Sequence, residues 1–135
     1  MEKNIILECS KKMSNGVVVV NSTPHDLTFL DGDTVVTVPC SVKEGEKTGP
    51  LVINARATEV PAREHLVRTS FAGDETGEAI IAAINEALPG AFIIGSIIAA
   101  QAYPGKVVGM TPAPGYERVA PAEKRMNVDK FTTFA

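Results

Sequence analysis

The alternation of apolar and polar positions along the chain predicts mainly short strands. Residues 17–20 are four consecutive valines, which predict a strand because the run is β-branched and too short for a helix. Residues 27–30 and 34–38 flank Asp31-Gly32-Asp33 and predict a β-hairpin, since an Asp-Gly pair supplies the positive φ that a tight turn needs. Further strands are predicted at residues 5–7, 51–56, 65–71, 106–110 and 131–134.

The stretch 91–105 combines a strand, a break and a helix. It begins as an apolar run, is interrupted at Gly95-Ser96 and continues in residues that suit a short helix. If Ser96 caps this helix, the free backbone N–H groups and the helix dipole form a seat for an anion; an ordinary structural cap is the alternative. Gln101 and Tyr103 are polar handles on an otherwise apolar segment.

The clearest helix is predicted between residues 74 and 88. Isoleucines recur there at helical spacing, acidic residues stand in the first turn and Pro89-Gly90 follows the end. With the strands above, this pattern predicts an α+β fold, mostly antiparallel sheet with two helices packed on one face. Residues 1–16 are expected to form an N-terminal arm or edge strand, and residues 17–135 a single α+β domain.

Composition and charge exclude some function classes. The chain has 135 residues, 44% of them hydrophobic, a net charge of −3 and a pI near 5.4. A general nucleic-acid or anionic-membrane binder needs a basic surplus, so both are disfavoured, whereas a small anion in one local basic pocket is not. Cys9 and Cys40 have no metal-ligand spacing, so neither a metal nor another cofactor is expected. Without a secretory signal or a membrane span in the pattern, we expect a cytoplasmic protein.

His25 and Ser96 are the candidates for catalytic chemistry. His25 lies in a Thr23-Pro24-His25-Asp26 turn and could be a base or a ligand contact, or could simply tie the turn to its neighbours. Ser96, His25 and Asp26 could in principle form a nucleophilic triad. The Gly-x-Ser-x-Gly pattern is missing, however, so catalysis of this kind is disfavoured.

The cationic candidates are Arg118 and Arg125, which lie on an irregular, proline-braced segment of the type that often carries binding sites. Arginine suits phosphate, and Tyr116 or Tyr103 could stack on a base. Arg56 and Arg63 are weaker candidates. An equally good reading is that Arg118 and Arg125 form intramolecular ion pairs with Glu117, Glu123 and Asp129.

Two stretches carry a resemblance to known proteins. They are Val-Asn-Ser-Thr-Pro-His at 20–25 and Ile-Ile-Gly-Ser-Ile-Ile-Ala-Ala-Gln-Ala-Tyr-Pro-Gly at 93–105, with Glu-Arg-Val, Lys-Arg-Met and Phe-x-x-Phe after them. Together they resemble small phage and prophage proteins that carry an Asn-x-Thr-Pro-His turn. Among these, the chain looks most like the Thoeris anti-defence proteins, which capture glycocyclic ADP-ribose, a signal made by bacterial TIR enzymes.

The resemblance covers roughly residues 17–134 and implies a binder that encloses its ligand without cleaving it. It also implies pockets between protomers of a homo-oligomer, dimeric or hexameric, and in some members separate arginine-lined sites for cyclic oligonucleotides. The candidate ligand-binding residues are Asn21, Thr23, His25, Ser96, Gln101, Tyr103, Arg118 and Arg125.

Three functions remain open from the sequence. The leading hypothesis is a phage anti-defence protein that sequesters a nucleotide-derived immune signal in the host cytoplasm. The alternative from a different class is a phage structural or assembly protein with no small-molecule ligand. An enzyme that cleaves a nucleotide is the least favoured.

Overall fold

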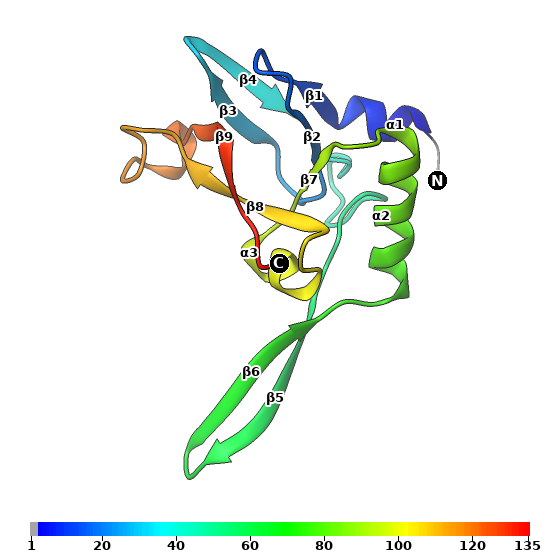
Figure 1. The fold of residues 1–135 in the computed structure, drawn as a ribbon, viewed down its shortest axis with the longest axis vertical. Helices are drawn as coiled ribbons and strands as arrows, with labels where there is room; N and C mark the ends of the chain where they lie inside the picture. Colours follow the sequence, from blue (N-terminus) through cyan, green and yellow to red (C-terminus); the bar gives the residue numbers. More distant parts are fainter. Residues whose placement is uncertain (1–2) are drawn as a thin grey trace.

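The computed structural model describes residues 3–135, in which a curved seven-stranded sheet is combined with three α-helices and a separate two-stranded hairpin (Figure 1). The strands of the sheet are β1 (Ser10–Lys12), β2 (Val18–Asn21), β3 (Leu27–Asp31), β4 (Thr34–Val38), β7 (Phe92–Ile94), β8 (Val107–Pro112) and β9 (Met126–Thr132). The hairpin is formed by β5 (Arg56–Arg63) and β6 (Leu66–Ala72), and the helices are α1 (Lys3–Glu8), α2 (Glu75–Ala87), α3 (Ile97–Ala102) and the 3-10 turn η1 (Pro121–Glu123).

The sheet has the order β1-β2-β7-β8-β9-β3-β4. Among the described residues antiparallel pairings outnumber parallel ones, four to three, which confirms the predicted α+β class. Strands β2, β7 and β8 run parallel to one another. The sheet curls on itself, so that the turn after β1 contacts strands that lie far from β1 in the strand order. Ser14 N donates to Asp31 Oδ2 at 2.8 Å, and Asn15 Nδ2 donates to the Val128 carbonyl at 2.9 Å.

Alternating side chains of the central strands enter two different cores, as the pleat of a strand requires. Val20 and Ile93 pack with all three helices, whereas Val19 and Ile94 pack inside the curve of the sheet. The core on the helix side contains Ile6, Ile80, Ile81, Ile84, Ala99, Ala100 and Tyr103, and the core inside the curve contains Met13, Leu27, Phe29 and Val38. The two predicted helices therefore do cover one face of the sheet, and α1 joins them there.

The first segment of the chain contains a helix where a strand was predicted. Residues 5–7 lie in α1, so the strand prediction is wrong. Ile6 is buried against α2. This tertiary contact favours a helix, because a helix can direct Ile6 into the core while its other side chains face outward. Residues 10–12 then form β1 at the edge of the sheet, paired antiparallel with β2.

Two other predictions need correction. Residues 51–53 are buried but lie outside any strand, and the strand begins only at Arg56. The last strand is β9 at Met126–Thr132 instead of residues 131–134, because it pairs with β8 on one side and β3 on the other. These are tertiary pairings, which a local pattern does not contain. The hairpin at 27–38, the helix after Asp74 and the strand near 106–110 are confirmed.

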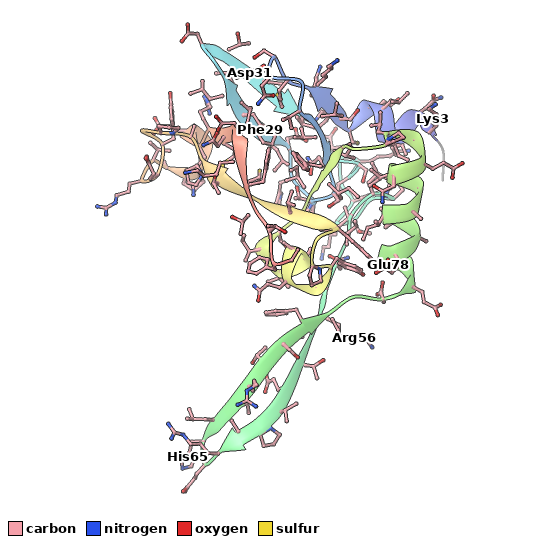
Figure 2. All side chains as sticks on the ribbon, in the orientation of Figure 1. Lys3, Phe29, Asp31, Arg56, His65 and Glu78 are labelled. Carbon is pink, nitrogen blue, oxygen red and sulfur yellow. The ribbon has the colours of Figure 1, made fainter. Side chains whose placement is uncertain are left out.

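The hairpin β5–β6 forms an arm that projects away from the body of the protein (Figure 1). Arg56 stands at its foot and His65 at its tip, with side chains that extend into solvent (Figure 2). Every residue of β5 is exposed, and in β6 every residue except the half-buried Phe71 is exposed. None of the helices in residues 3–135 has both the length and the apolarity needed to cross a membrane.

Candidate functional site

The Asn-Ser-Thr-Pro-His turn follows directly from β2 and is organised by Asn21. The Asn21 side chain is 1% exposed, and its Nδ2 donates to the carbonyl oxygens of His25 at 2.8 Å and Val38 at 3.1 Å. Its Oδ1 accepts from Thr23 N at 2.8 Å and from Thr23 Oγ1 at 2.7 Å. These four bonds use both donors and both acceptor positions of the amide. Asn21 is therefore a brace between the turn and β4, and it offers no free polar atom to a ligand.

Ser22 links this turn to the parallel strand β7 and to the segment before the arm. Its N and Oγ both donate to the Ile94 carbonyl, at 2.9 and 2.7 Å. The Ser22 carbonyl accepts from Ile53 N at 3.0 Å. The bond from Ile53 N holds residues 51–55 against the turn, although the two segments are about thirty residues apart in the chain. Sequence analysis missed this segment, because its apolar run had the pattern of a strand.

The Gly95-Ser96 break confirms the predicted strand, cap and helix. Ser96 Oγ accepts from Ala99 N at 3.0 Å, so Ser96 is the N-cap of α3. Gly95 fits because a Cβ at this position would stand 2.6 Å from Val107 Cγ1. The helix that follows has only six residues, so its dipole is that of a short helix.

A pocket of about 280 Å³ lies where these segments meet, at the carboxyl ends of β2 and β7. In sheets with parallel strands, this edge is where ligands usually bind. None of the lining side chains ionises, and hydroxyl and amide groups alternate there with apolar ones. We call it the carboxyl-end pocket; its lining is Ser22, Thr23, Pro24, Ile53, Asn54, Ala55, Ser96 and Ile98.

The structure brings together two of the eight candidate residues at this pocket, Thr23 and Ser96. Asn21 lies beneath it as the brace. His25 is exposed on the turn and Gln101 is exposed on α3, and neither lines the pocket.

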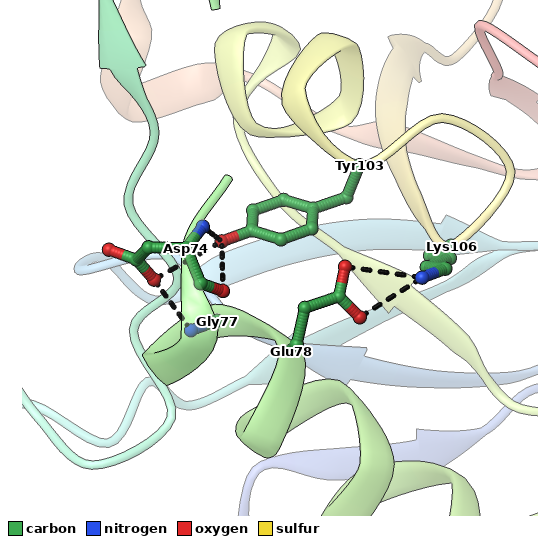
Figure 3. Close-up of polar contacts among 5 residues, drawn as sticks. All are labelled: Asp74, Gly77, Glu78, Tyr103 and Lys106. Atoms are coloured by element: carbon green, nitrogen blue, oxygen red, sulfur yellow. Dashed lines mark hydrogen bonds and ion pairs between the residues drawn. The ribbon is translucent and has the colours of Figure 1, made fainter. Parts of the chain in front are cut away.

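Tyr103 is buried and serves as a support for α2. Its side chain is 2% exposed, and its Oη accepts a hydrogen bond from Asp74 N at 2.8 Å (Figure 3). Asp74 in turn caps α2 by accepting from Gly77 N at 2.9 Å. Nearby, Lys106 Nζ pairs with Glu78 Oε2 at 3.0 Å and holds the same helix to the start of β8 (Figure 3). The Tyr103 ring is therefore occupied inside the protein and has no exposed face for a base.

Arg118 and Arg125 lie on the connection between β8 and β9 and do not line the carboxyl-end pocket. Arg118 is exposed, and Arg125 is half-buried with its Nη1 donating to the Lys124 carbonyl at 2.9 Å. In residues 3–135 Glu78 forms an ion pair with Lys106, and Glu64 Oε1 lies 3.4 Å from His65 Nε2, a contact that is an ion pair only when the imidazole is protonated. Of the two readings left open by the sequence, the pairing of Arg118 and Arg125 with nearby carboxylates is therefore not seen in residues 3–135. The exposed Arg118 is accessible to an anion, whereas Arg125 has one nitrogen engaged with the backbone. The arginine next to the pocket in the chain is Arg56, which follows Ala55 and is exposed.

The residues considered for catalysis are not joined to one another. Ser96 Oγ contacts Ala99 N, and Asp26 Oδ1 accepts from Cys40 N at 3.0 Å. Over residues 3–135 no hydrogen bond links the side chains of Ser96, His25 and Asp26, and no group of three His, Cys, Asp or Glu is placed to hold a metal. Cys9 is a free, buried thiol, and burial, reinforced by Cys40 nearby, raises its pKa to about 11.

Comparison of the chain with protein-family models, with curated proteins and with solved structures found no match.

Proposed function

We propose that this protein binds and sequesters a small nucleotide-derived immune signal, with glycocyclic ADP-ribose as the first candidate, and that it releases the molecule intact. On this proposal it acts as a phage anti-defence protein in the cytoplasm of the host bacterium. The observation that carries the proposal is the meeting of two chain segments at one pocket. The Ser22-Thr23-Pro24 turn and the Ser96 turn, which are the two stretches that resemble the anti-defence proteins, line the carboxyl-end pocket together.

The chemistry of the pocket supports a ligand with sugar or base edges inside and phosphate outside. The hydroxyl groups of Ser22 and Thr23 already donate within the protein and keep only acceptor positions for a ligand, whereas the amide of the exposed Asn54 can both donate to and accept from neutral polar groups. The pocket volume of about 280 Å³ lies just below the usual range for ligand sites, so it would hold only part of a dinucleotide-sized molecule. The phosphates would then lie at the mouth, where Arg56 begins the arm.

A titration of the purified protein with glycocyclic ADP-ribose, followed by heating and mass spectrometry of the released molecule, tests this proposal. Tight binding with release of the unaltered ligand supports sequestration. Release of a cleaved product would show an enzyme instead. If the folded protein binds no glycocyclic ADP-ribose, the proposal is refuted for this ligand.

Two isoleucines of α3 offer a matched pair of variants for locating the site. Ile97 and Ile98 are 44% and 45% exposed, but only Ile98 lines the pocket. Ile98→Glu places a negative charge in the pocket, close to the phosphates proposed at its mouth, and should weaken binding at least tenfold, whereas Ile97→Glu should leave binding nearly unchanged. Arg56→Ala should weaken binding, and Arg63→Ala at the tip of the arm is its control. If the two variants of each pair weakened binding equally, the binding site would lie outside this pocket.

The exposed arm favours a second candidate, a phage structural or assembly protein. Projecting hairpins with apolar side chains are suited to contacts between protein chains. The same titration separates the two functions, since an assembly protein binds no nucleotide signal.

A further inference from the structure

A second pocket lies at the opposite end of the strands that lead to the carboxyl-end pocket. Its volume is about 280 Å³, and it opens beside Phe92, the first residue of β7. Strands β2, β7 and β8 are parallel, so their amino ends lie together at this edge of the sheet. The two pockets share no lining residue. We call this one the amino-end pocket; its lining is Val17, Phe92, Val108, Asp129, Phe131 and Thr133.

Two phenylalanine rings form one wall of the amino-end pocket. Phe92 and Phe131 stand with their ring centroids 5.2 Å apart and their planes tilted by 47°. Phe92 is 41% exposed and Phe131 is half-buried, so part of each ring surface is accessible from the pocket. Because the centroids are this close, one cation can lie within about 6 Å of both, the range in which a ring face attracts a positive charge.

Asp129 is the ionisable side chain in the lining of the amino-end pocket. It is exposed, and in residues 3–135 its carboxylate takes part in no ion pair. Its backbone N–H donates to Asn127 Oδ1 at 3.1 Å, a bond that fixes the backbone at this point and leaves the carboxylate aside. The pocket therefore presents a negative charge beside two aromatic rings.

The surroundings of the pocket also favour a positive ligand. An adjoining pocket of about 470 Å³ shares Phe92, Val108 and Thr133 with it and includes Lys106. The ammonium group of Lys106 is already paired, with Nζ 3.0 Å from Glu78 Oε2, so it offers little attraction to an anion. The chain as a whole has a net charge of −3, which attracts cations to its surface.

We propose that the amino-end pocket binds a small organic cation, with the ammonium group held between Asp129 and the rings of Phe92 and Phe131. A quaternary ammonium suits it best, because its methyl groups pack on apolar walls while its charge is attracted by the rings and the carboxylate. A pocket of about 280 Å³ is smaller than most ligand sites, so it limits the ligand to about the size of choline. One carboxylate among apolar side chains offers too few oxygen ligands for a metal ion.

Two-dimensional NMR of the full chain, titrated with choline chloride, tests the proposal. The amide signals of Phe92 and Phe131 should shift and then saturate in the millimolar range, whereas sodium chloride at the same concentration should not reproduce the shifts. The neutral alcohol in which carbon replaces the charged nitrogen of choline has the same shape. It should bind about tenfold more weakly, because it lacks the attraction to the rings and to the carboxylate.

Substitutions at exposed positions locate the site without disturbing the core. Asp129→Asn removes the charge, and Phe92→Leu removes one ring while keeping an apolar side chain. Each should weaken choline binding about threefold, and the double variant about tenfold. Asp33→Asn and Phe134→Leu are the matched controls, since both residues are exposed and neither lines the pocket. They should bind choline as the wild type does.

Contrary results are readily recognised. Equal affinity for choline and for the neutral alcohol would show an apolar pocket without cation selectivity, and the proposal would be wrong. Shifts that never saturate, or that sodium chloride reproduces, would also refute it. Control variants that lose as much affinity as the pocket variants would place the site elsewhere. The assay contains no nucleotide and concerns a separate pocket, so its outcome is independent of the proposed sequestration function.

Discussion

Replacement of Asn21 by alanine is the sharpest test of the brace beneath the candidate site. The substitution removes four hydrogen bonds at once and leaves their partners in the protein. The His25 carbonyl can still accept from Thr23 Oγ1, which lies 2.9 Å away. The Val38 carbonyl and the Thr23 N–H belong to buried residues and lose their partner.

The expected cost follows from these two orphaned groups. A buried polar group left without a partner costs about 1–3 kcal/mol, so Asn21→Ala should lower the free energy of unfolding by about 4 kcal/mol. For a domain of 135 residues the entropy of unfolding is about 0.28 kcal/mol/K. The melting temperature should therefore fall by about 14 °C.

Urea denaturation followed by circular dichroism measures this loss, with Ser22→Ala as the control. That control removes one bond, from Ser22 Oγ to the Ile94 carbonyl, which keeps the bond from Ser22 N. It should cost about 1 kcal/mol. If Asn21→Ala costs no more than the control, the brace interpretation is refuted. If Asn21→Ala keeps its full stability but loses retention of the ligand, Asn21 is a ligand contact instead.

Three further predictions concern the support of α2 and the acid end of the stability curve. Tyr103→Phe removes the acceptor of Asp74 N and should cost about 1–2 kcal/mol in urea denaturation. Gly77→Ala, which would usually stabilise a helix, should also destabilise, because the added Cβ overlaps Tyr103 Oη; a gain in stability would contradict the packing described. Hydrogen bonds from the Ser14 hydroxyl and N–H lower the pKa of Asp31 from its ordinary 3.8. The stabilisation is therefore present above pH 3.8 and lost as the pH falls through the lower, folded-state pKa, so the melting-temperature gap between wild type and Asp31→Asn should be open at pH 6 and closed in strong acid. A gap that is constant with pH would exclude this linkage.

Local features of the sequence determined the elements that depend on neighbouring residues. Three examples are the Asp-Gly turn between β3 and β4, the Asp74 cap of α2 and the Ser96 cap of α3. Each of them involves residues that lie only a few positions apart in the chain. The two caps are set by side chains that accept from backbone N–H groups three residues on, and the turn is set by the positive φ of Gly32, so all three depend on local residues. The same holds for residues 92–96, where a short apolar run followed by Gly95 and Ser96 predicts a strand that ends just before a helix.

The tertiary structure decided which of these elements form a site. Tyr103 reads as a polar handle in the sequence, but the approach of α2 buries it against Asp74. Residues 51–53 have the composition of a strand, but a hydrogen bond from Ile53 N to the Ser22 carbonyl holds the segment against the turn, where Ile53 lines the pocket. The sequence groups Arg118 and Arg125 with Thr23 and Ser96 as candidate ligand-binding residues. In the fold, the loop that carries the two arginines does not line the carboxyl-end pocket.

The arm shows the same division in its simplest form. Its sequence predicts extended backbone for β6, with no clear inner face because polar and apolar residues share both sides, and predicts no strand for residues 57–63 of β5. Whether such a strand is covered depends on contacts between residues far apart in the chain, and the fold leaves it without cover. Local bonding is encoded in adjacent residues, whereas burial is a property of the whole packed chain, and for this reason only the tertiary structure could place the arm in solvent and the carboxyl-end pocket beside its foot.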